Sequence, residues 1–166
     1  MEFLIFSDSH GKRRNMELAL SRQVRKPDAI FFSGDGLRDI GDRMDGIPVF
    51  RVHGNCDWSL GIDADAPEEL TVTFGNRRIF LTHGHRLGAK SGVGGLLCAA
   101  AERNADIVLY GHTHIPALET VPAGTETACG VLPRAVSLFN AGSIAEGSFG
   151  TLTLTDSAVL FAHGSL

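Results

Sequence analysis

Short apolar runs recur along the chain, and each is followed by a polar turn that contains glycine. The first run, at 3–7, holds branched and aromatic residues and predicts a buried strand. An amphipathic pattern at 16–24 then predicts a helix, with Asn15 as its N-cap. A second apolar run at 29–32 predicts another buried strand. Strand, helix and strand in this order indicate a parallel βαβ unit.

The pattern changes in the second half of the chain. Alternating residues at 70–74 and 78–82, separated by a turn at Gly75-Asn76, predict a hairpin. Because a hairpin is antiparallel, we expect mixed sheets. The remaining expected elements are a helix at 96–102 after a Gly-rich lead-in at 91–95, a loop or short helix at 37–46, a loop at 62–67, and strands at 48–52, 107–110, 116–121, 136–139, 150–154 and 159–162.

Length and composition narrow the class of protein. The 166 residues suffice for a sizeable core, and we expect one domain spanning residues 1–166. A formal net charge of −4 argues against nucleic acid or an anionic membrane as a partner. No apolar run approaches the roughly 20 residues of a membrane span, and no secretory signal pattern precedes the first strand, so we expect a cytoplasmic protein. Cys56, Cys98 and Cys129 show no paired spacing, so no disulfide framework is expected.

Five predicted strands end in residues that could bind a metal ion. In open α/β sheets, ligand sites lie at the carboxyl ends of strands, so we expect these residues to meet. Each motif alone has an ordinary alternative, because Asp-x-His is common on exposed surfaces and Gly-Asp or Gly-Asn is common in turns. Their recurrence after apolar strands favours a metal site. The candidates are Asp8, His10, Asp35, Asn55, His83, His112 and His114.

Seven donors exceed the four ligands of one tetrahedral ion and fit two ions that share a carboxylate. Two divalent ions would bring four positive charges against the two negative charges of Asp8 and Asp35. Even with a bridging hydroxide the site stays positive, which favours an anion such as a phosphate ester. Paired metals about 3.5–4 Å apart are an established arrangement for hydrolysing phosphoesters.

These residues carry a resemblance to a known family. The chain is similar, over residues 3 to about 145, to the calcineurin-like metallophosphoesterase superfamily. Its short length, its Gly-Asn-Cys-Asp block and its turn at 140–143 resemble the small YfcE-type phosphodiesterases of bacteria and archaea. The resemblance implies an α/β fold of the mixed α+β kind, a four-layer αββα sandwich with two mixed β-sheets. The matching blocks are Asp8-x-His10, Gly34-Asp35, Gly54-Asn55-Cys56-Asp57, His83-Gly84-His85 and Gly111-His112-Thr113-His114.

The resemblance also implies the cofactor and its ligands. Two divalent metal ions are expected, with Mn²⁺ first and Zn²⁺, Fe, Ni²⁺ or Mg²⁺ as alternatives, since nitrogen and oxygen ligands alone do not choose among them. The implied ligands are Asp8, His10 and His114 for the first ion, Asn55, His83 and His112 for the second, and Asp35 as the bridge between them.

The resemblance leaves the proton donor unassigned. Cys56 stands where many family members have histidine, and a thiol near cations could have a lowered pKa. His85 follows His83 by two residues, so in an extended chain it faces the same way and is a catalytic candidate, beside Asn55. It could contact the phosphate, protonate the leaving alkoxide, or hydrogen-bond behind the ligands. Asp57 could orient a ligand or be a solvated turn residue, and the solvated turn residue is expected.

Three further residues have expected places but no assigned chemistry. His53 and His163 are expected in strands, and Asn140 either shapes the pocket or only forms a turn.

The implied function is hydrolysis of a small phosphodiester, in which a hydroxide bridging the two ions attacks phosphorus in line. Phosphomonoesterase and nucleotide hydrolase are the alternatives among enzymes, and a non-catalytic scaffold of the same fold is the alternative outside them. Competent donors at all seven ligand positions favour an enzyme. We expect no nucleic-acid or membrane partner, and a homo-oligomer is left open.

Overall fold

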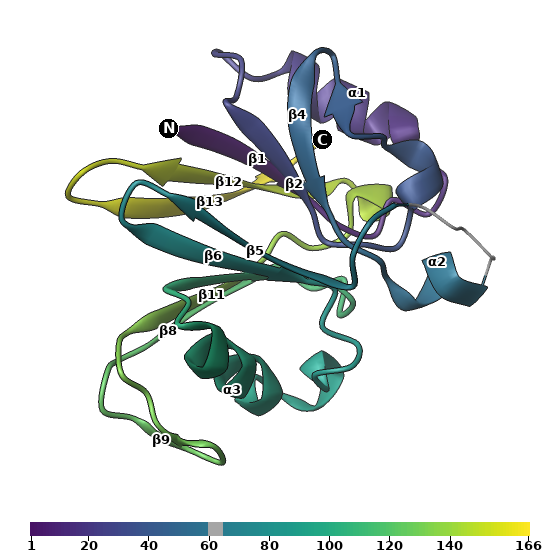
Figure 1. The fold of residues 1–166 in the computed structure, drawn as a ribbon. Coiled ribbons are helices and arrows are strands. Elements are labelled where there is room, and N and C mark those ends of the chain that lie inside the picture. Colours follow the sequence, from purple (N-terminus) through teal and green to yellow (C-terminus); the bar gives the residue numbers. More distant parts are fainter. Residues whose placement is uncertain (60–64) are drawn as a thin grey trace.

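The computed structural model describes residues 1–59 and 65–166 and shows two mixed β-sheets packed face to face (Figure 1). In spatial order, the first sheet holds β13 (Val159–Ser165), β12 (Ser148–Leu154), β1 (Glu2–Phe6), β2 (Ala29–Phe32), β4 (Ile47–Arg51) and β3 (Arg43–Met44). The second holds β5 (Glu69–Phe74), β6 (Arg77–Thr82), β7 (Ile107–Tyr110), β11 (Val136–Asn140) and β8 (Ala117–Val121). A separate short hairpin pairs β9 (Glu126–Thr127) with β10 (Gly130–Val131).

The central core lies between the two sheets. Successive residues of a strand point to opposite faces, and here both faces are covered. On β6, Ile79 and Leu81 belong to the cluster between the sheets, whereas Phe80 belongs to the cluster on the other side of its sheet. From the first sheet, Phe3 and Phe31 reach the same central cluster with their ring centroids 5.4 Å apart. Burial on both faces explains why these strands read as continuous apolar runs.

One helix covers each outer face of the sandwich (Figure 1). Helix α1 (Arg13–Ser21) buries Met16 and Ala19 in the cluster on the first sheet. Helix α3 (Gly94–Arg103) buries Leu96 and Leu97 in the cluster on the second. The expected αββα sandwich of two mixed sheets is therefore confirmed. The short helices are α2 (Asn55–Ser59), η1 (Leu37–Asp39), η2 (Ala89–Ser91) and η3 (Ile144–Glu146).

Three neighbouring strands of each sheet run parallel. They are β1, β2 and β4 in the first sheet and β6, β7 and β11 in the second. The other pairs within the two sheets are antiparallel. Loops that follow these parallel strands meet at one end of the sandwich, where a carboxylate oxygen of Asp8 lies 3.9 Å from an imidazole nitrogen of His83. Ligand candidates from both sheets are thus brought to a common edge.

Some expected element boundaries were wrong. Helix α1 begins at Arg13, with Lys12 at the N-cap position, so Asn15 lies inside the helix and is not its cap. The Asn15 Nδ2 donates to the Ile144 carbonyl 2.9 Å away. The helix ends at Ser21, three residues before the expected end. The polar turn after β4 contains helix α2, and the region at 37–46 contains both η1 and β3. The expected loop at 62–67 lies partly outside the described residues.

A disulfide between Cys98 and Cys129 contradicts the expectation that none forms. Their Cα atoms are 5.6 Å apart although 31 residues separate them, so the fold and not the sequence spacing pairs them. The bond joins α3 to the turn between β9 and β10 and leaves Cys56 as a free thiol. Because disulfides are rare in cytosolic proteins, the cytoplasmic location stays a prediction. Within the described ranges, no helix combines the length and apolar character needed to cross a membrane.

Candidate metal centre

Asp8 and His10 lie in the loop after β1, where the backbone is no longer extended. Their φ angles are +54° and +43°, in the left-handed region. The sequence also predicts that Asp8 and His10, two residues apart in an extended chain, point to the same side. The backbone is not extended here, so that prediction was wrong, although the two side chains do come together, with His10 Nε2 3.8 Å from Asp8 Oδ1. The loop is held by backbone hydrogen bonds from Asp8 to Gly34 and from His10 to Asp35.

Left-handed backbone is a shared property of the candidate ligands. Asp35, His112 and His114 also have positive φ angles, of +60°, +68° and +62°. Asp, Asn and His tolerate this region better than most residues, but it still costs about 1–3 kcal/mol per position when the surroundings impose it. The loops must therefore be held firmly by the rest of the fold.

Asp57 is one of the groups that hold them. It lies in α2 and is 1% exposed, so the expectation of a solvated turn residue was wrong. Its Oδ2 accepts hydrogen bonds from the backbone N–H groups of Asp35 and Gly54, each 2.9 Å away. Its Oδ1 accepts from the N–H groups of Gly36 and Leu37, also at 2.9 Å. One buried carboxylate thus fixes the loops after β2 and β4 against each other.

Asn140 plays the same part for the loop after β7. Its Nδ2 donates to the Gly111 carbonyl at 2.9 Å and to Thr113 Oγ1 at 3.0 Å, and its Oδ1 accepts from the Gly142 N–H. Its own carbonyl lies 2.8 Å from His163 Nε2, in β13. Asn140 therefore positions the loop that carries His112 and His114, which goes beyond turn formation.

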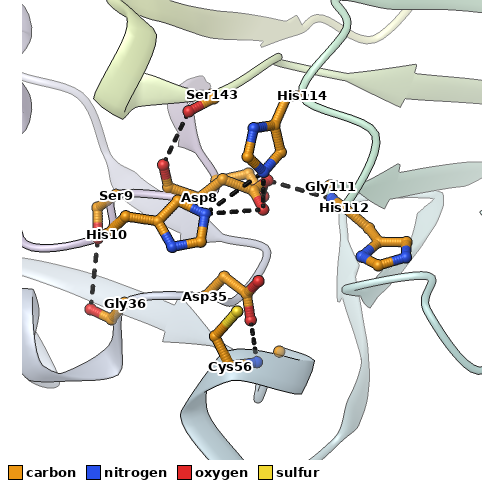
Figure 2. Close-up of polar contacts among 12 residues, drawn as sticks. Asp8, Ser9, His10, Asp35, Gly36, Cys56, Gly111, His112, His114 and Ser143 are labelled. Atoms are coloured by element: carbon orange, nitrogen blue, oxygen red, sulfur yellow. Dashed lines mark hydrogen bonds and ion pairs between the residues drawn. The ribbon is translucent and has the colours of Figure 1, made fainter.

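Asp8 occupies the centre of the site (Figure 2). The side chain is fully buried, and its Oδ2 accepts hydrogen bonds from Ser7 Oγ and from the backbone N–H of His112 at 3.1 Å. Its backbone carbonyl accepts from Ser143 Oγ at 3.0 Å. Both the side chain and the main chain of Asp8 are thus fixed.

The second carboxylate oxygen of Asp8 lacks a hydrogen bond. Asp8 Oδ1 is buried and lies 3.2 Å from Nε2 of His114, 3.8 Å from Nε2 of His10 and 3.9 Å from Nε2 of His83. A buried oxygen without a hydrogen bond costs free energy unless a partner is bound. An acceptor oxygen surrounded by imidazole nitrogens is a donor set that suits a divalent metal ion. The residues present therefore fit the expected cofactor.

His83 is oriented from behind by the backbone. Its Nδ1 lies 2.7 Å from the Ser33 carbonyl, to which an Nδ1–H would donate. This leaves Nε2 facing the site, 3.4 Å from Asp35 Oδ2 and 3.2 Å from Asn55 Oδ1. Metal-binding histidines commonly donate their other ring N–H to a carbonyl in this way, which fixes the tautomer.

Burial and charge shift the pKa values of the central groups. Burial raises the pKa of Asp8. Burial alone would also raise the pKa of Asp35, but the hydrogen bond and charge of His83 hold it well below its usual range. Burial alone would lower the pKa of His83, but Asp35 and Asp8 raise it. A bound cation would compete with the protons that the raised pKa values of Asp8 and His83 favour.

His112 and His85 lie beside His83. Ring centroids of His83 and His112 are 5.0 Å apart, and those of His83 and His85 are 5.4 Å apart. Burial and the charge of His83 lower the pKa of His112 to about 4, and the same two causes lower the pKa of His85. Gly84 has a φ of +92°, so the chain between His83 and His85 is not extended as expected. His85 nevertheless stands next to two ligand candidates.

Cys56 lies directly beside Asp35. Its backbone N–H donates to Asp35 Oδ1 at 2.8 Å, and Asn55 Nδ2 donates to its sulfur at 3.4 Å. Burial, followed by the neighbouring Asp35 carboxylate, raises the pKa of the Cys56 thiol to about 11 in the metal-free protein. The lowering expected beside bound cations stays a prediction. The prediction that His53 lies in a strand was also wrong. His53 follows β4 and stacks on Trp58, with ring centroids 4.5 Å apart.

Three overlapping groups of side chains could hold a metal ion in the described part of the chain. Within each group, one ligand atom per residue lies within 4.8 Å of the others. Asn55 and His112 lie at the edge of these groups, next to His83. How the ligands divide between two ions stays a prediction. The groups are Asp8, His10 and His114; Asp8, Asp35 and His83; and His10, Asp35 and Cys56.

Comparisons with known proteins agree with this geometry. The sequence profile of the calcineurin-like phosphoesterase superfamily domain matches residues 1–162. The probable metallophosphoesterase YsnB of Bacillus subtilis (strain 168) is 34% identical over 145 residues, which cover 87% of this chain and 75% of that protein. The phosphodiesterase YfcE of Escherichia coli (strain K12) is 37% identical over 76 residues, which cover 43% of this chain and 37% of that protein. A crystal structure of a conserved Streptococcus pneumoniae TIGR4 protein, described as a predicted phosphoesterase, superposes with a TM-score of 0.73 at 27% identity, covering 99% of this chain and 88% of that one.

Proposed function

Because the chain belongs to the calcineurin-like phosphoesterase superfamily, we propose that it is a metal-dependent phosphodiesterase that uses two divalent ions. The observation that carries the proposal is the buried Asp8 Oδ1, which has no hydrogen bond and faces the imidazoles of His10, His83 and His114. A buried acceptor oxygen among imidazole nitrogens is a donor set that suits a divalent cation.

The ions would be held by groups from both sheets. In the proposed arrangement, Asp35 lies between them, and its carboxylate is already fixed by the Cys56 N–H and by His83. When bound, two divalent ions supply Lewis acidity toward phosphoryl oxygens and lower the pKa of water, so that hydroxide is available near neutral pH. Mn²⁺ is the first metal we would supply. The proposed ligands are Asp8, His10 and His114 for one ion, and Asn55, His83 and His112 for the other.

The remaining groups of the site position these ligands and handle the leaving group. Asp57 and Asn140 hold the loops, and the Ser33 carbonyl orients His83. His85 lies next to His83 and His112, and it carries the proposed role of contacting the phosphate or protonating the leaving alkoxide. Burial and the charge of His83 lower the pKa of His85 in the metal-free protein. A protonated imidazole with a lower pKa releases its proton more readily.

One comparison supports a diester as the substrate. The name of the Escherichia coli relative states a phosphodiesterase, and the 76 residues that match it are 37% identical. A monoester or nucleotide anhydride would be served by the same ligands, so the diester is tested against the monoester directly.

The experiment is hydrolysis of an aryl phosphodiester and of the matching monoester by protein stripped of metal and then supplied with Mn²⁺. We expect Mn²⁺ to restore diester hydrolysis in the wild type. Asp35→Asn and His112→Ala should lower it by about 100-fold or more, since each removes a group from the centre. Asp42→Asn serves as the matched control, because the Asp42 side chain is 85% exposed and pairs with Arg51 on the surface.

Three other outcomes would each contradict one part of the proposal. A strong preference for the monoester would replace the phosphodiesterase assignment with a phosphomonoesterase. Metal binding without turnover of either substrate would favour a scaffold of the same fold. Full activity after exhaustive metal removal would exclude the metal-dependent mechanism.

A further inference from the structure

A thiol lies within the reach of the metal centre. Figure 2 shows the Cys56 sulfur beside the Asp35 carboxylate, on the helix α2 that follows β4. One nitrogen of His10, one carboxylate oxygen of Asp35 and the Cys56 sulfur lie within 4.8 Å of one another. Ligands of one zinc ion stand about 2.0–2.3 Å from it, so small side-chain rotations would bring all three atoms around one ion.

These three side chains also line one cavity. Its volume is about 260 Å³, which leaves room for an ion with water in open coordination positions. Its walls carry the carboxylates of Asp35, Asp39 and Asp57 against one guanidinium, that of Arg38. This balance of charge favours a cation.

Most of the acidic groups in the cavity are already engaged. Asp39 Oδ2 accepts hydrogen bonds from Ser9 Oγ and from the Gly11 N–H, and Asp57 accepts from four backbone N–H groups. Asp35 offers the carboxylate that faces the thiol. An ion in the cavity would therefore meet one oxygen, one nitrogen and one sulfur donor rather than a ring of carboxylates.

We infer that Cys56 is a metal ligand and that, with His10 and Asp35, it makes this side of the centre selective for thiophilic divalent ions such as Zn²⁺ or Cd²⁺. The inference rests on the proposed metal centre and adds the metal preference that the oxygen and nitrogen ligands leave open. Thiolates favour zinc and other soft ions, whereas Mn²⁺ and Mg²⁺ prefer oxygen. On binding, a sulfur–metal bond forms and the thiol proton leaves to solvent.

The neighbouring residues fix the sulfur for this role. The Cys56 N–H donates to Asp35 Oδ1, and Asn55 Nδ2 donates to the sulfur. Cys98 and Cys129 are joined in a disulfide, so Cys56 is the chain's remaining cysteine. A thiolate–metal signal can therefore be assigned to Cys56.

The test is titration of the metal-free protein with Cd²⁺, followed by the sulfur-to-cadmium charge-transfer absorption in the ultraviolet. We expect the band in the wild type and its loss in Cys56→Ser. A matched Cys98→Ser/Cys129→Ser double variant keeps Cys56 and should keep the band. We further expect Cys56→Ser to weaken Cd²⁺ and Zn²⁺ binding about tenfold or more while Mn²⁺ binding changes about twofold or less.

A second measurement needs no variant. Alkylation of the wild-type thiol by iodoacetamide should slow when Zn²⁺ is bound, and slow less with Mn²⁺. No band in the wild type, or equal loss of Mn²⁺ and Zn²⁺ affinity in Cys56→Ser, would overturn the inference.

The two proposals fail separately. Diester hydrolysis by the wild type with Mn²⁺ but without a sulfur-to-cadmium band refutes the thiol ligand alone. A band without hydrolysis of either ester refutes the phosphodiesterase alone.

Discussion

Asp57 shows how one residue can organise a site without facing it. Its buried carboxylate accepts four backbone hydrogen bonds from two loops, one of which carries Asp35. The sequence offered only a polar residue after a glycine-containing turn, which is also typical of solvated loops. The N–H groups of Asp35, Gly36 and Leu37, three of its four donors, lie 20 to 22 residues earlier in the chain, so the role depends on tertiary structure.

At this scale the first prediction concerns Asp57→Ala. The substitution leaves four backbone N–H groups without an acceptor, and we expect the free energy of unfolding to fall by about 3 kcal/mol or more. Asp42→Ala removes an exposed carboxylate paired with Arg51 and should cost about 1 kcal/mol or less. Urea unfolding of both variants measures the difference. Equal losses would show that Asp57 does not hold the loops.

A second residue-scale prediction concerns pH and the metal-free protein. The pKa of His112 is lowered from 6.5 to about 4, so between these values the folded state binds fewer protons than the unfolded state. The free energy of unfolding should therefore fall as pH drops from about 6.5 to about 4, and His112→Gln should reduce this slope. Denaturant unfolding across this range measures it.

His83 provides the comparison of opposite sign. Its pKa is raised, so its contribution is complete below pH 6.5 and is lost as pH rises through the folded-state pKa. His83→Gln should therefore change the slope above pH 6.5, where His112→Gln changes nothing. Identical slopes in the wild type and both variants would contradict the assigned shifts.

At the scale of elements, strands were more predictable than the loops that follow them. Strands buried on both faces are continuous apolar runs, and both β2 and β7 lie where such runs predicted them. The ligand candidates were also visible, because donors recur at strand ends. Their left-handed backbone was not, since φ depends on how Asp57 and Asn140 fix the loops. The disulfide was missed because the fold alone brings its cysteines together.

Close packing between loops gives a prediction at this scale. A Cβ added to Gly54 would overlap the Asp35 carboxylate, whereas one added to Gly41 would meet nothing within 4 Å. Neither glycine has a positive φ, so the two positions differ in the room available for a Cβ and not in backbone strain. We expect Gly54→Ala to destabilise the protein by about 1–3 kcal/mol and to weaken metal binding, and Gly41→Ala to do neither. Thermal unfolding and Mn²⁺ titration check both, and equal behaviour would mean that Asp35 is not held by this contact.

At the scale of the whole molecule, the site joins the two sheets. Asp8, His10 and Asp35 follow strands of the first sheet, whereas His83 and His114 follow strands of the second. A bound ion would therefore connect both halves of the sandwich, and binding would stabilise the entire fold rather than one loop.

Metal removal should accordingly lower the melting temperature of the protein. At a metal concentration of 100 times Kd, the folded state should gain about 2.7 kcal/mol per site. Calorimetry with chelator and then with added metal measures the shift, and Asp8→Asn should abolish most of it. A melting temperature that is the same with and without metal would contradict a centre shared by both sheets.

Packing and chemistry depend on different residues of this molecule, the first on the parallel strands and the second on the loops after them. Strand side chains such as Ile79, Phe80 and Leu81 fill the cores, while the ligand candidates stand beyond the last strand residue. Exchange of one apolar strand residue for another alters packing without moving a donor, and exchange of a loop residue alters the chemistry without opening a cavity in the core. Substitutions in the core strands and substitutions in the ligand-bearing loops can therefore accumulate independently, and the loop substitutions alone change specificity.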